Sequence, residues 1–225
     1  MVRSNTYYML ISSLPALPPR LDVDRLPITL ERLQARLRML EPEDAQTISR
    51  MLYILGLAWS HQFVEADDAA VVKRYGEIMQ ELTNPLVREV FTTAMDVRMV
   101  VAALRRRRLG LGPPTVGFGQ WFDHIRRHFN QPDFRLSHVL PGIIRFEQLL
   151  GQGDVLNLYR HMLGAVWTYL KKRAEDYVFS FEAVVLYIAR WEIMRQWRQL
   201  QAEHGRAVFE ALVTEALGDY AKLYA

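Results

Sequence analysis

Four consecutive arginines are the residues of this chain best suited to binding chemistry: Arg105, Arg106, Arg107 and Arg108. Guanidinium groups bind phosphates, carboxylates and acidic lipids through charge-assisted hydrogen bonds. Cations at the C-terminal end of a helix also complement the helix dipole and keep that end solvated. Successive residues point in different directions around a helix, so the four cannot form one flat patch. The run therefore indicates either an anion-binding end or, more commonly, an ordinary solvated helix terminus.

Two histidines, His124 and His128, have the spacing at which a helix can present two imidazoles to one metal ion. The residues between them include Arg126 and Arg127, whose charges oppose a bound cation. The glutamate of the HExxH pattern is missing, and no third ligand is evident in the sequence. We therefore expect no metal here, and a metal-dependent helical enzyme is kept only as a hypothesis for elemental analysis to test.

Other chemistry-bearing patterns are missing from the sequence. It has no cysteine, which excludes disulfides, thiolate catalysis and cysteine-ligated metals. It has no GxSxG, P-loop or GxGxxG motif, and Gly117-Phe118-Gly119 lacks both a third glycine and a preceding strand. Acidic pairs such as Asp67 and Asp68 fall at predicted helix starts, where carboxylates complement the dipole. We expect a protein that is not an enzyme, with no cofactor and no small-molecule substrate.

Nearly every long segment has the 3.6-residue hydrophobic period of a helix, and none has a sustained period of two. The first segment, 7–14, is the exception that we interpret as a short strand or extended arm, because Tyr, Ile and Leu favour extended structure. Prolines then continue this stiff connection to Pro27. The pattern predicts helices over 30–40, 42–61, 67–82, 85–109, 118–129, 139–150, 154–177, 181–204 and 206–224.

The break at Gly110, Gly112, Pro113 and Pro114 is the best candidate for a boundary between lobes. It divides the chain into an N-terminal extended arm (1–28), a first helical lobe (29–112) and a second helical lobe (113–225). We predict an all-α, multi-helix fold, built as two lobes or as one irregular bundle, with a V-shaped or funnel-like arrangement as one form.

Composition narrows the partners. The 225 residues are 50% hydrophobic and 24% charged, which is typical of a globular protein, and the formal net charge is +3. That charge is far below the excess of a dedicated nucleic-acid binder. The longest apolar stretch without charge, about 51–64, is too short to span a bilayer, so we expect any membrane association to be peripheral.

Five segments, in order along the chain, resemble a bacterial family of uncharacterised helical proteins. Genes of that family lie among those of V-type ATPases, in the place expected for the stalk component of the C/d type. The segments are the start YYMLISSLP (7–15), the turn MDVR (95–98) followed by AALR (102–105), the element DFRLS (133–137), the FSFE segment (179–182) and the RQWRQL segment (195–200).

This resemblance implies a non-catalytic protein, similar to the C/d-type stalk component, that joins the central shaft to the membrane rotor ring. The implied partners are the shaft subunits and the ring, in a machine that transports protons or sodium. The implied location is cytoplasmic, peripheral on the cytoplasmic face of the inner membrane. Contact residues are expected at Asp96, Arg98 and the arginine run 105–108. The alternative is a helical adaptor that binds nucleic acid or an acidic protein through its basic helix end.

Overall fold

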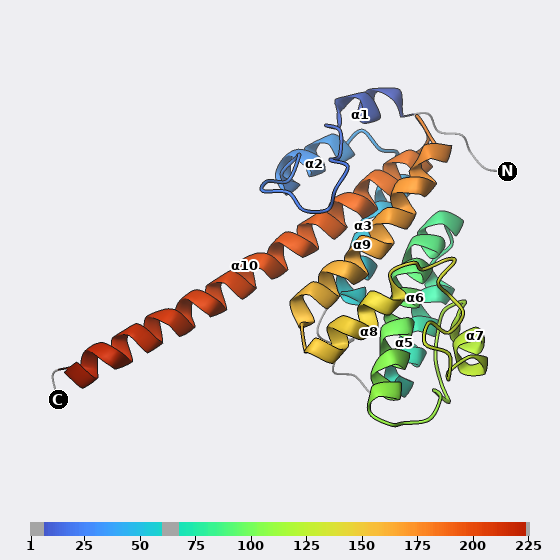
Figure 1. Cartoon of the computed structure of the whole chain (residues 1–225). Coiled ribbons are helices and arrows are strands. Elements are labelled where there is room, and N and C mark those ends of the chain that lie inside the picture. Colours follow the sequence, from blue (N-terminus) through green and yellow to red (C-terminus); the bar gives the residue numbers. More distant parts are fainter. Residues whose placement is uncertain (1–6, 60–67, 224–225) are drawn as a thin grey trace.

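The computed structural model describes residues 7–59 and 68–223; for Asp68, His204 and 206–223 only the backbone is described. The described residues are mostly helical and contain no strand, which confirms the predicted all-α fold. The elements, drawn in Figure 1, are α1 (Tyr8–Ser13), α2 (Leu30–Leu37), α3 (Pro42–Ala58), α5 (Asp68–Glu81), α6 (Pro85–Arg108), α7 (Phe122–Arg127), α8 (Ile143–Gln152), α9 (Val155–Arg173), the 3-10 helix η1 (Ala174–Asp176) and α10 (Phe181–Leu223).

Helix α6 lies at the centre of the packing, in contact with α3, α7, α8, α9 and α10. Its buried positions cover more than one face, including the fully buried Val90, Ala94, Val100 and Ala103. The main hydrophobic core continues from Tyr7 near the N-terminus to Trp197 in α10. Segments on both sides of the break at 109–114 contribute to it, so the described residues form one irregular bundle around a shared core rather than two separately cored lobes.

Local sequence signals set several helix ends where the patterning predicts them. Pro42 and Pro85 each occupy a first helical position, where the missing N–H costs nothing. The Asn84 side chain accepts hydrogen bonds from Leu86 N (3.0 Å) and Val87 N (3.1 Å), capping α6. Gly153 ends α8 in the left-handed conformation, with φ +68°.

The extended interpretation of 7–14 is wrong, because residues 8–13 form helix α1. Tertiary contacts decide this: Leu10 is 1% exposed within the main core, and Tyr7 N donates to the Phe179 carbonyl oxygen (2.7 Å). A helical turn brings Tyr7 and Leu10 to the same side of the backbone. A preference for strand is weak where packing favours another conformation.

Other boundaries differ from the predicted ones. The expected end at His204 is wrong, since α10 continues through Gly205 to Leu223. A glycine inside a helix costs only about 1 kcal/mol relative to alanine, and no proline follows it. Helices α7 and α8 begin later than predicted, at Phe122 and Ile143. The predicted ends at His61 and Asp67 lie outside the described residues. None of the helices in 7–59 and 68–223 combines the length and apolarity needed to cross a membrane.

Candidate partner-binding site

All six residues expected to contact partners lie on α6, and the structure gives them different tasks. Asp96 is fully buried and accepts a hydrogen bond from the backbone N of Gln120 (2.8 Å), which fixes the segment after the Gly/Pro break against α6. Its second carboxylate oxygen has no hydrogen-bond partner among the described residues. Burial raises the pKa of Asp96 from 3.8 to about 6. The side chain therefore has no surface through which to touch a partner in this conformation.

The glycine pair considered above as an incomplete nucleotide motif has a packing role. Gly119 has φ +81°, and a Cβ atom placed on it would overlap the Asp96 carboxylate. A Cβ atom on Gly117 would overlap the ring of Phe122. Both positions thus need glycine for close approach, and Gly119 also needs it for its left-handed backbone.

Arg98 is half-buried beside the end of α3, where its guanidinium donates to the Ala58 carbonyl oxygen. Tyr159 of α9 donates to the neighbouring carbonyl of Trp59 (2.7 Å). Terminal carbonyls of a helix lack intrahelical partners, so these two side chains stabilise the C-terminal end of α3. Burial lowers the pKa of Arg98, with the charge on Arg105 as a lesser cause.

Arg107 is committed to the loop that follows α7. Its guanidinium donates to the carbonyl oxygens of Phe129 (3.3 Å), Gln131 (2.5 Å) and Pro132 (2.8 Å). It also pairs with Glu147 of α8 (2.9 Å) and lies 4.8 Å from the ring centroid of Phe134. A planar fork with five donors suits this multiple contact, and lysine could not reproduce it.

The turn held by Arg107 is the DFRLS element. Phe134 and Arg135 have φ +49° and +58°, a left-handed conformation that is strained for residues with a Cβ atom. The Asp133 carboxylate accepts from Arg135 N (2.9 Å) and from the Ser137 hydroxyl, which compensates part of that strain. These hydrogen bonds, the Ser137 one foremost, lower the pKa of Asp133. Two of the segments that resemble the V-type ATPase-associated family, 102–105 and 133–137, are thus linked through the adjacent Arg107.

The remaining arginines lie nearer the surface. Arg106 donates to the Gly112 carbonyl oxygen (3.3 Å), and Arg108 donates to that of Gly151 (3.2 Å). Arg105 is exposed and has no hydrogen bond or ion pair among the residues described. Within the described part of the chain the run therefore divides into one latch, two carbonyl-bound arginines and one free cation. Only its exposed members, Arg105 and Arg108, can meet a partner directly.

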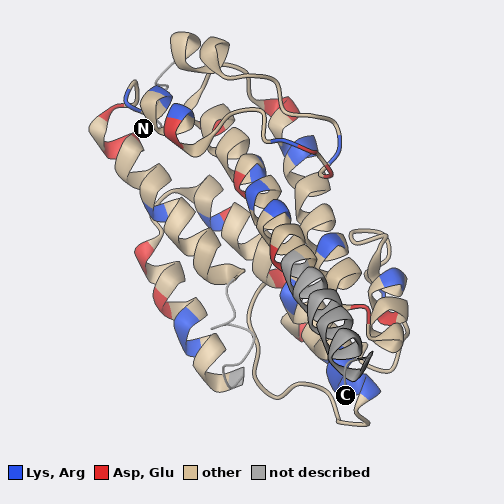
Figure 2. Ribbon diagram, turned by 90° about the vertical axis from the view of Figure 1, so that its left-hand side faces the viewer, with Lys and Arg blue, Asp and Glu red and all other residues tan. Residues whose placement is uncertain are grey.

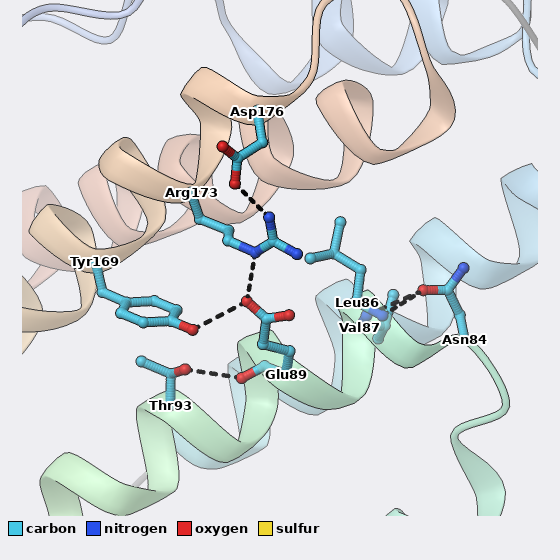
Figure 3. Close-up of polar contacts among 8 residues, drawn as sticks. All are labelled: Asn84, Leu86, Val87, Glu89, Thr93, Tyr169, Arg173 and Asp176. Carbon is cyan, nitrogen blue, oxygen red and sulfur yellow. Dashed lines mark hydrogen bonds and ion pairs between the residues drawn. The ribbon is translucent and has the colours of Figure 1, made fainter.

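A charged network that the sequence did not reveal joins the other half of α6 to α9. The Glu89 carboxylate accepts from Arg173 Nε (2.9 Å) and from the Tyr169 hydroxyl (3.0 Å), and Arg173 also pairs with Asp176 (Figure 3). The hydrogen bond with Glu89 contributes most to the raised pKa of Arg173. No local signal predicts these contacts, because Glu89 and Arg173 are 84 positions apart.

This network borders a cleft of about 1140 Å³ between α6, α9 and the loop at 138–142. Its lining includes Arg160, Lys172, Arg173 and Asp176. Arg160 pairs with Asp22 and Arg173 with Asp176, so both cleft arginines are neutralised within the chain. The cleft consequently lacks the concentrated charge of one sign that would recognise an ionic substrate.

The two histidines lie close together, with ring centroids 4.5 Å apart. No group of three or more His, Cys, Asp or Glu residues suited to a metal ion occurs in the part of the chain that the structure describes. Desolvation lowers the pKa of His128, and the charges of His124, Arg135 and Arg127 lower it further. Those surrounding charges oppose a bound cation.

Comparison with known proteins gives one result. Residues 59–217 match a family described as "Protein of unknown function (DUF2764)". No curated protein matches the chain, and no solved structure matches it. The matched stretch runs from the end of α3 through most of α10 and includes every α6 residue discussed above. Because it covers well over half of the chain, this protein belongs to the DUF2764 family.

Proposed function

We propose that this chain is a non-catalytic coupling subunit of a bacterial V-type ATPase, linking the central shaft to the membrane rotor ring for proton or sodium transport. The five ordered segments that resemble the V-type ATPase-associated family supply the link to that machine. The structural observation that carries the proposal is the shape of α10, because a coupling element must be rigid, anchored at one end and able to reach outward.

Helix α10 has 43 residues and therefore a length of about 65 Å at 1.5 Å per residue. Its first half is anchored in the core, where Val184, Leu186 and Trp191 are fully buried. Past Trp197 the burial falls away, and 201–203 are exposed. Figure 1 shows α10 continuing beyond the other helices as a single rod. A rod with a buried base can transmit force from a partner to the whole bundle.

The chemistry of the described residues supports the same proposal. Asp96, Arg98 and Arg107 are engaged in holding the bundle together, and the charges of the cleft are largely paired. A steady mechanical link needs such internal cross-bracing and needs no reacting group. A net charge of +3 gives no comparable support to a nucleic-acid adaptor.

The test is co-purification of the tagged full-length chain from native membranes under mild detergent. We expect the ATP-hydrolysing head subunits and the rotor ring to co-purify in fixed proportion. Their consistent absence would rule out the proposal.

A matched pair of variants tests the role of α10. Ala202 is exposed beyond the buried half of the helix, so Ala202→Pro should kink the rod without disturbing the core. We expect this variant to fold and to lose the ATPase subunits, whereas Ala202→Ser keeps them. Equal co-purification with both variants would remove the helix from the proposed contact.

A further inference from the structure

The end of α6 and the turn after it expose an unusual combination of side chains, which we call the arginine–leucine tip: Arg105, Arg108, Leu109, Leu111 and Val116. Leu109 is 73% exposed, Leu111 47% and Val116 43%. Figure 1 shows α6 ending at the lower edge of the bundle, with the following loop forming its lower extremity. Three large aliphatic side chains thus lie uncovered at one end of the molecule.

The turn that carries the leucines is hydrogen-bonded to the helix. Leu109 N donates to the Arg105 carbonyl oxygen and Leu111 N to that of Arg106, both at 3.0 Å. Gly110 lies between them with φ +69°, the left-handed conformation that ends helices. The leucines are therefore held outward by a defined cap, and they lose little conformational entropy when a partner covers them.

The charge around the tip is of one sign. No aspartate or glutamate occurs between Val97 and Phe122. Arg105 and Arg108 are three positions apart, so they share a face of α6, and both are exposed. Arg105 has no ion pair among the described residues, and the carbonyl partner of Arg108 leaves its charge uncompensated. Figure 2 shows basic positions at the lower end of the bundle, beside the loop after α6.

We propose that the arginine–leucine tip binds the surface of an anionic lipid bilayer. Phosphate-bearing headgroups would neutralise the arginines, and the leucines and Val116 would enter the boundary between headgroups and acyl chains. A nucleic acid would satisfy the arginines but would leave the aliphatic side chains in water. This inference deepens the proposed function and rests on it for which membrane is met, because a protein beside the rotor ring lies next to headgroups.

The test is sedimentation of the purified full-length chain with lipid vesicles. The vesicles are either phosphatidylcholine alone or the same lipid with about one third phosphatidylglycerol, since the anionic surface supplies the attraction. We expect binding only to the anionic vesicles, weakening as salt is added. Arg105→Gln with Arg108→Gln should lower the partition coefficient roughly 25-fold, at about fivefold for each arginine.

A second variant separates insertion from simple charge attraction. Leu109→Ser with Leu111→Ser keeps every charge and should still lower the partition coefficient about tenfold. The matched control is Arg38→Gln with Met39→Ser, which removes an exposed arginine and an exposed apolar side chain at the end of α2. Helix α2 lies at the opposite end of the bundle (Figure 1), so this control should bind as the unaltered chain does.

Three outcomes would overturn the inference: binding that the leucine substitutions do not change, release of the chain from vesicles by inorganic phosphate, or equal loss in the α2 control. Binding of duplex DNA without dependence on the leucines would identify a polyanion surface instead. The outcomes are separable from the proposed function, because ATPase subunits that co-purify with a chain unable to bind vesicles would refute only the bilayer contact.

Discussion

The two ends of α6 use charge in opposite ways. Near its start, Glu89 accepts from Tyr169 and Arg173, and Arg173 in turn pairs with Asp176, so charges of both signs meet within the chain. Near its end, no carboxylate accompanies the arginine run within α6 or the following turn, and Arg105 is left without an ion pair among the described residues. One end is internally satisfied, and the other presents charge outward.

This contrast shows that charge density alone does not mark a binding surface. Arg107 belongs to the same run as Arg105, yet it resembles the paired end, because Glu147 and three backbone carbonyls take up its donors. What separates structural from available arginines is the direction in which each leaves the helix and what lies there. Four substitutions test this difference.

The largest effect is expected midway along α6, where Asp96 meets Gly119. Gly119→Ala should lower the free energy of unfolding by about 3 kcal/mol, because a Cβ atom would overlap the Asp96 carboxylate and φ is positive. Urea denaturation followed by circular dichroism measures it. Gly76→Ala in α5 is the matched control: its Cβ atom meets no other atom within 4 Å, so alanine should leave stability unchanged or raise it.

The next effect separates two members of the arginine run. Arg107→Ala should lower the free energy of unfolding by about 2 kcal/mol, because buried carbonyls and Glu147 lose their donors. Arg105→Ala should change it by less than about 0.5 kcal/mol, as for an exposed residue without contacts. Chemical denaturation of the two variants in parallel compares them, and equal losses would contradict the division of the run.

A third prediction uses pH. Because burial raises the pKa of Asp96 to about 6 in the folded chain, the folded state keeps a proton that the unfolded chain has released above 3.8. The stabilisation from that bound proton is present at acid pH and is lost as the pH rises through about 6. Between about pH 5 and 7.5 the unfolding free energy should fall by about 1 kcal/mol from this group.

Asp96→Asn removes the titrating group and should flatten that part of the pH dependence, whatever its effect on absolute stability. Denaturation of both proteins across this pH range makes the measurement. Parallel pH profiles for the two proteins would show that Asp96 does not titrate as its burial requires.

The smallest effect is expected at the paired end. A double-mutant cycle of Glu89→Gln and Arg173→Gln should give a coupling energy of about 0.5 kcal/mol, because both side chains are about one third exposed and water screens the pair. A coupling well above 1 kcal/mol would mean that the cleft is drier than the exposure of these groups indicates.

Much of the fold was predictable from sequence because it depends on local physics. Asn84 and Pro85 define the start of α6 in any context, since an N-cap acceptor and a fixed φ act within a few residues. The failures lie where local preferences are weak. Residues 7–14 became helical because Leu10 could be buried in the core, and Gly205 did not end α10 because glycine costs a helix only a little.

The candidate site was predictable in position but not in role. Sequence reasoning placed Asp96, Arg98 and the arginine run on one helix with the run at its end, and the structure has them there. It could not show that Asp96 is sealed by Gly119 or that Arg107 reaches Glu147. Those contacts join residues 23 and 40 positions apart, and no periodic pattern encodes which distant segment will cover a given side chain.

By itself, then, the sequence determined that this protein is helical, where most helices begin, and that basic charge collects at the end of α6. Periodicity and capping act over one or two turns, so they are written in neighbouring residues. Only the tertiary structure decided which charges are consumed internally. That outcome depends on the packing of α6 against α8 and α9, which turned Arg107 into a latch and left Arg105, Leu109 and Leu111 at the surface.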